Sequence, residues 1–409
     1  MLLRRLLLQH FGYVNKKRFL KSQSEFTVLY SSNRRNHEDV DDDWDEDGEL
    51  AYSDVPRPGK KWERKPYPTP MKELIRRAKE QKRDRQENPC RLLEHPPENG
   101  LLVPDLIEVA YQVYHARESL LHSLSWLIDG DAAIPVKKCR FCSEIHIGHY
   151  GHEIRSCEGR KSGSRNGSHV WKRGGIRDVV GFPYCYHLYD RVGKPRVGHK
   201  ERFGIQRLPA IVELCIQAGL NLPDYLTKRR TKPVYSIEGR IVDFEPENEE
   251  VVHVEERIID PPEQYSFKEG STTSELSARA LESWLEMRLG AMKLMKKYSV
   301  LTCGYCPEVQ VGPKGHKVRM CKAAKHQFRA GLHAWQEATI DDLIIPNYVW
   351  HVRDLNGPPL VNELKRYYGK APAIVELCVQ AGVPVPDQYA SMMRLDVVPP
   401  DHDEYDLVA

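Results

Sequence analysis

The chain contains two stretches that share one pattern of cysteine, histidine, glycine and tryptophan. Each member of the first set recurs 164 positions downstream. The first set is Cys139, Cys142, Gly151, His152, Cys157, Gly167, His169, Trp171, His187 and Asp190, and the second is Cys303, Cys306, Gly315, His316, Cys321, Gly331, His333, Trp335, His351 and Asp354. The heptapeptide PAIVELC at 209–215 also returns unchanged at 372–378. Because the thiols and imidazoles persist while the sequence around them has drifted, we predict a metal-built module present twice.

Length and composition suit small modules better than one large enzyme domain. A chain of 409 residues suggests two to three domains, and the repeat favours two. Mean hydropathy is −0.58, so we expect modest cores and sizeable unfolded stretches. The predicted fold class is α+β, with small zinc-stabilised modules. Each of two tandem copies would contain a helix, a Cys/His zinc knuckle, a basic loop and a closing helix, with acidic flexible linkers between them. No run approaches the length of a transmembrane helix, so no membrane partner is expected.

Apolar spacing predicts helices over 101–128 and 276–295, one before each cysteine set. The closing helix is expected to begin with Pro209 in its first turn and to end at Gly219 as its cap. Pro372 and Gly382 repeat this design. A charged helix is expected over 71–86, and weak β-like alternation occurs near 237–244.

Charge patterning divides the rest of the chain. The first 36 residues are basic, amphipathic and poor in acids, which is typical of an organelle transit peptide, although a disordered basic tail has a similar composition. Few serines occur before position 22, which favours the mitochondrion over the chloroplast. An acidic run at 38–54 precedes a basic one at 57–85, interpreted as a solvated linker or as an arm that contacts a polyanion. The predicted division is a 1–36 transit peptide, a 37–99 disordered acidic then basic segment, a 100–227 first module, a 228–273 acidic linker, a 274–391 second module and a 392–409 acidic tail.

Both copies share the pattern C-x2-C-x9-H-x4-C, which suits a closed tetrahedral Zn²⁺ site. The predicted ligands of two zinc ions are Cys139, Cys142, His152 and Cys157 in the first copy and Cys303, Cys306, His316 and Cys321 in the second. His169 and His333 are equally duplicated and are the alternative nitrogen donors. His146 and His149 face Gln310 and Pro313, so neither can be a ligand common to both copies. An iron–sulfur cluster is the competing cofactor, but it usually takes four cysteines. The alternative without a metal is that these cysteines are free thiols buried in the core.

A closed site of four ligands holds shape and leaves no position for a substrate. Structural zinc contributes on the order of 10–16 kcal/mol, so metal removal is expected to unfold a module with a small core. The cysteine pattern and the lack of a secretory signal favour metal-bound thiolates in a reducing compartment over disulfides.

Basic residues follow the third cysteine in both copies, as expected of a phosphate-binding face. The predicted RNA-binding residues are Arg155, Arg160, Lys161, Arg165, Trp171, Lys172 and Arg173, with Lys317, Arg319, Lys322, Lys325, Arg329 and Trp335 in the second copy. The two tryptophans could stack on unpaired bases. The alternative is that they pack against the metal site.

These motifs, together with the segment Tyr186–Asp190 and PAIVELC, resemble the plant APO family, whose name abbreviates "accumulation of photosystem one". The resemblance covers roughly 100–227 and 274–391. It implies a plant organellar protein with zinc-dependent RNA-binding modules that promotes splicing of group II introns. The aligned cysteines and histidines would then be zinc ligands, and intron RNA, single-stranded or structured, would be the partner together with other splicing factors.

The leading hypothesis is therefore a non-enzymatic RNA-binding factor that assists intron folding. A second hypothesis is an assembly factor that scaffolds or delivers a zinc or iron–sulfur cofactor to organellar complexes. A third is an endonuclease that uses His187, His351, Asp190 and Asp354, but the repeats contain no duplicated carboxylate cluster suited to Mg²⁺. We therefore predict no catalytic residues.

Overall fold

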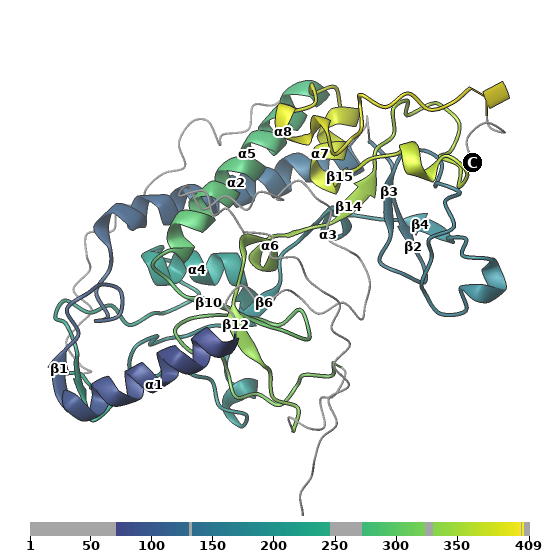
Figure 1. Ribbon diagram of the computed structural model, residues 1–409. Helices are drawn as coiled ribbons and strands as arrows, with labels where there is room; N and C mark the ends of the chain where they lie inside the picture. Colours follow the sequence, from purple (N-terminus) through teal and green to yellow (C-terminus); the bar gives the residue numbers. More distant parts are fainter. Residues whose placement is uncertain (1–70, 131–132, 246–271, 324–329, 402, 405–409) are drawn as a thin grey trace, which may run out of the picture. The chain divides into compact units, whose positions relative to one another are not determined.

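The computed structural model describes residues 71–130, 133–245, 272–323, 330–401 and 403–404 (Figure 1). The predicted transit peptide, the acidic run at 38–54 and residues 246–271 of the predicted linker lie outside these ranges. So do Lys325 and Arg329.

The two repeats contain the same elements in the same order. The first has α2 (Pro104–Asp129), β2 (Val136–Cys139), β3 (Ile145–Ile147), β4 (Trp171–Arg173), α3 (Ile176–Val179), β5 (Val180–Gly181), β6 (Tyr184–Tyr186), β7 (Arg207–Pro209) and α4 (Ala210–Ala218). The second has α5 (Thr273–Met295), β10 (Val300–Cys303), β11 (Val309–Val311), β12 (Trp335–Glu337), α6 (Ile340–Leu343), β13 (Ile345–Pro346), β14 (Tyr348–Trp350), β15 (Lys370–Pro372), α7 (Ala373–Gln380) and α8 (Asp387–Ala390). Short 3-10 turns lie at Gly163–Arg165, Glu201–Phe203 and Lys365–Tyr367. Helix and sheet are thus mixed, as predicted.

The helix boundaries follow local chemistry closely. Thr272 caps α5, because its hydroxyl accepts from the Glu275 backbone N–H while the Glu275 carboxylate accepts from the Thr272 N–H. Gly219 caps α4 with φ +128°, a conformation that favours glycine. The proline prediction is off by one position, since Pro209 precedes α4 as its N-cap residue. In the second copy α7 ends at Gln380, so Gly382 lies just beyond the helix.

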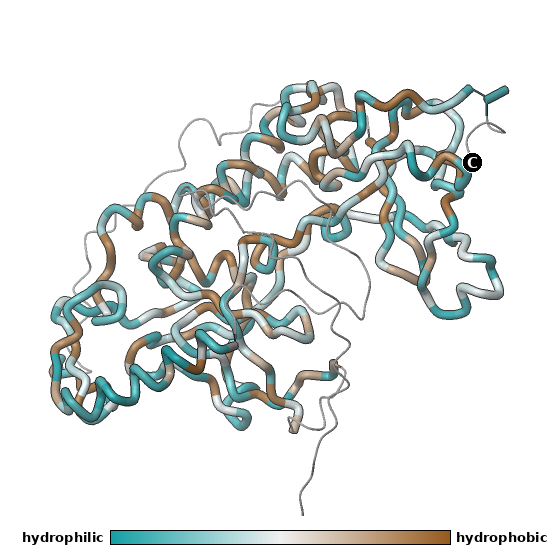
Figure 2. Tube along the Cα trace, viewed as in Figure 1, coloured by the Kyte–Doolittle hydropathy of each residue, from teal (hydrophilic) through white to brown (hydrophobic). Residues whose placement is uncertain are grey.

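The region before and after the first repeat has more regular structure than the sequence suggests. α1 (Met71–Glu87) matches the predicted charged helix and is hydrophilic along its length (Figure 2). β1 (Cys90–Leu92) pairs with β8 (Tyr235–Ile237), which pairs with β9 (Arg240–Val242). The start of the predicted flexible linker is therefore a hairpin. Arg230 fastens it, donating to Asp190 at 2.5 Å and to Asp243 at 2.8 Å.

The two repeats meet about an approximate twofold axis, as two subunits of a symmetric dimer would. α2 and α5 pack side by side (Figure 1). Ser283 donates to Ser119 at 3.0 Å, and these serines occupy equivalent repeat positions. The equivalent residues Gly181 and Ile345 pair between β5 and β13. Contacts between a residue and its own counterpart are the mark of an isologous interface.

Each repeat also packs its cysteine-bearing sheet against the closing helix of the other repeat. β3 contacts β14 and α7, while β11 contacts β6 and α4. One hydrophobic core accordingly joins side chains from both repeats, and every residue of α4 is buried within it. The repeats were expected to be separate modules on a linker, but each repeat packs its sheet against the closing helix of the other. The exact module boundaries remain predictions.

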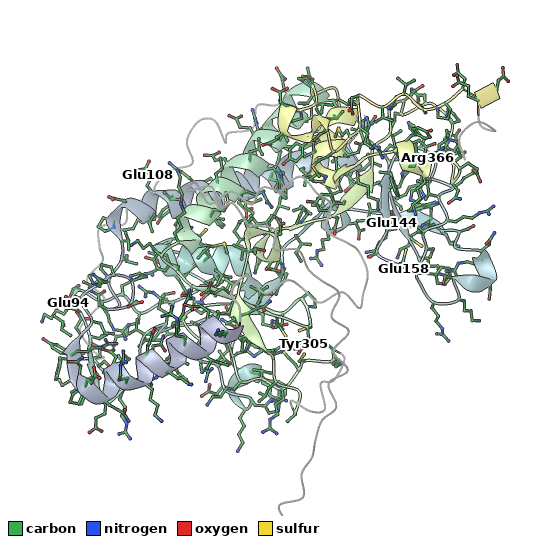
Figure 3. All side chains as sticks on the ribbon, in the orientation of Figure 1. Glu94, Glu108, Glu144, Glu158, Tyr305 and Arg366 are labelled. Carbon is green, nitrogen blue, oxygen red and sulfur yellow. The ribbon has the colours of Figure 1, made fainter. Side chains whose placement is uncertain are left out.

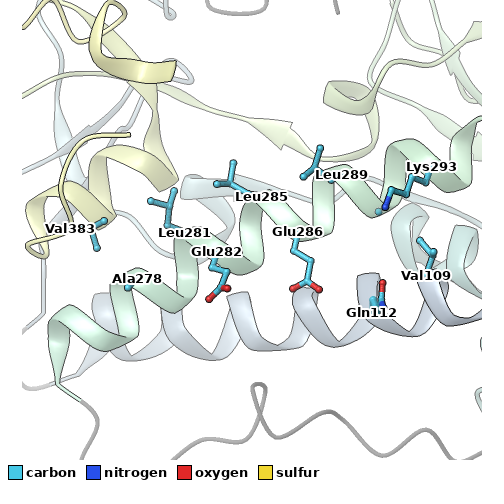
Figure 4. A pocket seen from close by; sticks show the side chains of 11 residues that line it. Val109, Gln112, Ala278, Leu281, Glu282, Leu285, Glu286, Leu289, Lys293 and Val383 are labelled. Carbon is cyan, nitrogen blue, oxygen red and sulfur yellow. The ribbon is translucent and has the colours of Figure 1, made fainter. Parts of the chain in front are cut away.

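An open groove runs along the exposed side of α5 (Figure 4). Leu281, Leu285 and Leu289 line it together with the carboxylates of Glu282 and Glu286. An acidic and apolar lining does not suit a polyanion. None of the described helices is both long enough and apolar enough to cross a bilayer.

Candidate metal centres and nucleic-acid interface

Two small antiparallel sheets position the cysteines. We call residues 136–173 the first Cys/His region and residues 300–337 the second. The order is β3-β2-β4 in the first and β11-β10-β12 in the second. Cys139 ends β2 opposite Trp171, and Cys303 ends β10 opposite Trp335. The chain then turns, so that Cys142 returns toward Cys139, and the Cys139 sulfur accepts from the Phe141 N–H at 3.4 Å.

Three sulfurs and one imidazole converge in each region. The first cluster is Cys139, Cys142, Cys157 and His169, and the second is Cys303, Cys306, Cys321 and His333, with the donor atoms of each cluster all within 4.8 Å of one another. The Cys139 and Cys157 sulfurs lie 4.0 Å apart. The Cys142 sulfur lies 3.4 Å from His169 Nδ1, and the equivalent distance to His333 Nδ1 is 3.3 Å. Neighbouring donors in a tetrahedral zinc site lie about 3.5–3.8 Å apart, so these residues fit such an ion.

The histidine in each cluster is the alternative donor, not the favoured one. His152 and His316 lie outside the two clusters and are buried behind them. His152 Nε2 lies 3.7 Å from a Glu144 oxygen, and His316 Nε2 lies 3.3 Å from Glu308. The imidazoles whose donor atoms lie within 4.8 Å of the sulfurs are therefore those of His169 and His333, whereas the preferred His152 and His316 lie beside glutamates.

The duplicated Gly-His pairs have a packing explanation. A Cβ on Gly151 would lie 2.0 Å from the Trp171 indole, and one on Gly315 would lie 2.3 Å from Trp335. Glycine therefore allows each indole to lie against the backbone. Trp171 Nε1 donates to the His152 carbonyl at 3.4 Å, and Trp335 Nε1 makes the equivalent bond at 3.1 Å. Both tryptophans are half-buried, which agrees with the packing role.

Glu144 and Glu308 connect these buried histidines to the other repeat. Arg207, on β7 of the first repeat, donates to Glu308 at 2.7 Å. Lys370, on β15 of the second repeat, donates to Glu144 at 3.3 Å. Burial raises the pKa of Glu144, but His152 and Lys370 outweigh it and lower the pKa to about 2. Figure 3 labels Glu144 in the first Cys/His region and Tyr305 in the second. These ion pairs make the contact between repeats reciprocal.

Several donor groups of the two clusters have shifted pKa values. Burial lowers the pKa of His169 to about 4, so the imidazole is neutral and able to ligate at pH 7. Burial raises the pKa of Cys142 to about 12. In the second cluster a hydrogen bond from Cys306 lowers the pKa of Cys303 to about 3, while the same contact raises the pKa of Cys306. A divalent metal, when bound, favours the thiolate form of all three sulfurs.

His187 and His351, considered above as possible catalytic residues, form hydrogen bonds with buried glutamates of the closing helices. His187 Nδ1 lies 2.7 Å from Glu213, and His351 Nδ1 lies 2.8 Å from Glu376. Both glutamates are fully buried. Each glutamate also accepts a backbone N–H, so both oxygens of each carboxylate have a hydrogen-bond partner. Asp190 accepts from the backbone N–H groups of the turn that follows it. These duplicated residues hold the fold together.

The His187–Glu213 pair is expected to make stability depend on pH. Burial lowers the pKa of His187, but the hydrogen bond and charge of Glu213 outweigh it, so the pKa is raised. The pair's contribution is therefore complete below the unfolded pKa of about 6.5 and is lost as pH rises through the folded value. Glu213→Gln should cost about 3 kcal/mol at pH 6 and less at pH 9, as measured by denaturant unfolding. An equal cost at both pH values would contradict this assignment.

The predicted RNA-binding residues fall into two settings. Arg155, Arg160, Lys161, Lys172 and Arg173 have exposed side chains in the first Cys/His region, and Lys317, Arg319 and Lys322 are exposed in the second. Arg165 is half-buried, with its guanidinium 4.0 Å from the Phe141 ring centre and 3.5 Å from the Cys157 sulfur. Phe141, Lys137, Lys138 and Arg140 lie beside Cys139 in the same region, and they were not among the candidates predicted from the sequence. The sequence does distinguish these positions, because the second copy has no cation at any of them.

Substitution of the two histidine types should separate ligand from packing residue. We expect His169→Asn to reduce bound metal from two ions to one, because it removes a donor from the first cluster. His152→Asn should retain two ions while lowering the thermal midpoint. Metal per chain after dialysis against a weak chelator is the measurement. If His152→Asn lost an ion while His169→Asn kept both, His152 would be the ligand in the first cluster.

The fold and the clusters define a class of protein, in which a duplicated Cys₃His module forms two candidate metal centres around one shared core. A sequence model described as APO RNA-binding matches residues 39–243 and 253–399. The chain is 60% identical to APO protein 3, mitochondrial, of Arabidopsis thaliana, over 91% of this chain and 93% of that protein. It is 45% identical to APO protein 2, chloroplastic, of the same species, over 84% of this chain and 79% of that protein.

It is also 42% identical to APO protein 1, chloroplastic, of Arabidopsis thaliana, over 87% of this chain and 83% of that protein. The chain belongs to the APO RNA-binding family, and the resemblance drawn from its motifs is confirmed. No solved structure matches it.

Proposed function

We propose that the chain is a non-catalytic RNA-binding protein of plant mitochondria that promotes splicing of group II introns. One observation carries the proposal: each half of an APO RNA-binding chain holds a complete Cys₃His cluster bordered by exposed cations. The mitochondrial assignment is supported by the 60% identical relative named as mitochondrial. Splicing is supported by the family resemblance, and the chemistry would remain with the RNA.

We propose zinc as the ion in both clusters. The ligands would be Cys139, Cys142, Cys157 and His169 in the first, and Cys303, Cys306, Cys321 and His333 in the second. Three sulfurs and one nitrogen at tetrahedral spacing match structural zinc, whereas an iron–sulfur cluster usually takes four cysteines. Ser156 Oγ lies 3.1 Å from His169 Nε2 and would fix the orientation of the first imidazole.

The alternative assembly role receives less support from the geometry. A factor that delivers a metal must release it, whereas Cys139, Cys157, Cys303 and Cys321 are all buried. Buried thiolates in a four-donor site exchange their ion slowly and serve to hold shape. The clusters therefore suit a scaffold for an RNA-binding surface.

Filter binding of the purified full chain to mitochondrial intron RNA over a salt series tests the proposal. We expect the logarithm of the association constant to fall linearly with the logarithm of salt, with a slope of about −0.7 for each single-strand phosphate contacted. Metal removal should abolish binding. Binding that is absent, or that does not change with salt, would refute the RNA-binding function.

A further inference from the structure

The two Cys/His regions share a backbone but differ in the charge of their sheets. In the first region Lys137 lies opposite Arg173, and Lys138 lies opposite Lys172. Like charges directly opposite each other destabilise an antiparallel pair. Asp178 and Asp129 bind Lys138 and Arg173, but Lys137 and Lys172 have no ion-pair partner among the described residues. This sheet retains unbalanced positive charge at a cost to its own stability.

The sheet of the second region has no cation at the equivalent positions. The four equivalent positions are Leu301, Thr302, Gln336 and Glu337. Thr302 and Gln336 are buried there, whereas Lys172 is exposed in the first region. Glu337 accepts from Arg77 of α1 at 3.1 Å, so a basic helix lies where the first region presents its own cations. The second sheet is therefore partly covered and cannot serve as an equivalent polyanion surface.

The turn between the first two cysteines shows the same difference. We call Arg140, Phe141, Arg160, Lys161 and Arg165 the first tip. Arg165 Nη1 donates to the Arg160 carbonyl at 2.8 Å while its guanidinium covers the Phe141 ring. Phe141 nevertheless remains 38% exposed. In the second region Gly304 and Ala324 replace Arg140 and Arg160, whereas Lys325 and Arg329 keep the charges of Lys161 and Arg165. The first tip therefore has two cations that the second region lacks.

The first tip has the chemistry of a single-strand RNA platform. Aromatic rings and guanidinium planes stack on unpaired bases, and neighbouring cations hold the backbone phosphates. Arg140, Arg160 and Lys161 are exposed and make no ion pair within the part of the chain that the structure describes. Arg165 also lies 3.5 Å from the Cys157 sulfur, so the metal cluster and the platform share a contact.

Two cations of the second region, Lys317 and Arg319, lie on the seam between the repeats. The Lys317 N–H donates to the Val197 carbonyl at 2.9 Å, and the Arg319 N–H donates to His199 Nδ1 at 3.1 Å. Arg196 Nε donates to the Gly315 carbonyl at 3.1 Å. The first region makes the equivalent contacts, because the Glu153 N–H donates to the Leu360 carbonyl at 2.8 Å and the Arg155 N–H donates to Asn362 Oδ1 at 3.0 Å. The seam residues of both regions, Arg155 included, are therefore left out of the surface proposed here.

We propose that the chain engages single-stranded RNA through one repeat only, at the first tip and the adjacent Lys137 and Lys172. The second Cys/His region supports the fold from the other side of the approximate twofold axis. This inference rests on the proposed RNA-binding function and specifies its surface.

Two matched triple variants of the full chain test it with a single-stranded intron oligonucleotide. The first combines Arg140→Gln, Arg160→Gln and Lys161→Asn, since asparagine tolerates the positive φ of 58° at position 161. The control combines Lys314→Gln, Lys317→Gln and Lys322→Gln, which removes the same charge from exposed positions in the second region. We expect the first variant to lose at least tenfold in affinity at 0.1 M salt and to show a shallower salt slope. The control should stay within twofold.

A second pair of variants separates the contribution of base stacking from that of charge. Phe141→Leu should weaken binding at least fivefold, as expected for the loss of one stacked base, while Tyr305→Leu at the equivalent position should not. Both variants should retain the wild-type metal content, which shows that the clusters are intact. Equal losses from the two regions, or a larger loss from the second, would overturn the single-repeat surface. Failure of the wild-type chain to bind would instead refute the function itself.

Discussion

Replacement of Cys306 with serine is expected to release one metal ion and to unfold both repeats. Structural zinc contributes on the order of 10 kcal/mol, which is comparable to the whole stability of a typical domain. Cys306 belongs to the second cluster, yet β11 beside that cluster packs against α4 and β6 of the first repeat. Loss of the second cluster therefore exposes the core face of the first repeat.

Metal analysis and amide hydrogen exchange can follow this variant together. We expect one ion per chain at most, and loss of exchange protection in α4 as well as in β10 and β11. Cys90→Ser provides the control, because Cys90 is exposed and lies outside both clusters. Full protection of α4 in the Cys306 variant would show that the repeats fold independently.

Sequence alone predicted the six cysteines that converge in the two clusters, and it could not choose the histidine that joins them. His152 and His169 are both duplicated, and both lie at a spacing that could close a tetrahedron. The choice depends on Glu144, which attracts His152 inward and is itself held by Lys370 of the other repeat. A contact between residues more than 200 positions apart leaves no trace in local spacing.

The sequence contains one indication that each repeat packs against the closing helix of the other. PAIVELC places Glu213 in the middle of an apolar helix, which requires a buried partner for its charge. Ile211, Leu214 and Cys215 form one apolar stripe, but Val212 and Ile216 extend it around the helix. A helix that is apolar on nearly all sides is covered from more than one direction. The repeat pattern predicted the elements correctly, but it could not show which copy's sheet packs against which closing helix.

Separation of the chain within residues 246–271 should produce two halves that do not fold alone. The buried faces of α2 and α5 would be exposed to water, including Leu120, Leu124, Trp284 and Met287. Each such side chain contributes about 1.5–3 kcal/mol on burial, so the lost interface is worth on the order of 10 kcal/mol before the other contacts are counted. We expect each half expressed alone to aggregate or to bind a hydrophobic dye.

Co-expression of the same halves should recover a one-to-one complex, because the contacts that the structure describes between the repeats come from residues outside 246–271. Size-exclusion chromatography and metal content report the outcome, with two ions expected per complex. A first half that is monomeric, folded and loaded with its own ion would show that α2 needs no partner. Halves that fold only when they are expressed together would mean that the duplication produced an internal dimer. An internal dimer would explain why the second copy has the cysteines of the first without its cationic sheet, since the shared core needs both clusters and the proposed RNA surface needs the charge of one copy only.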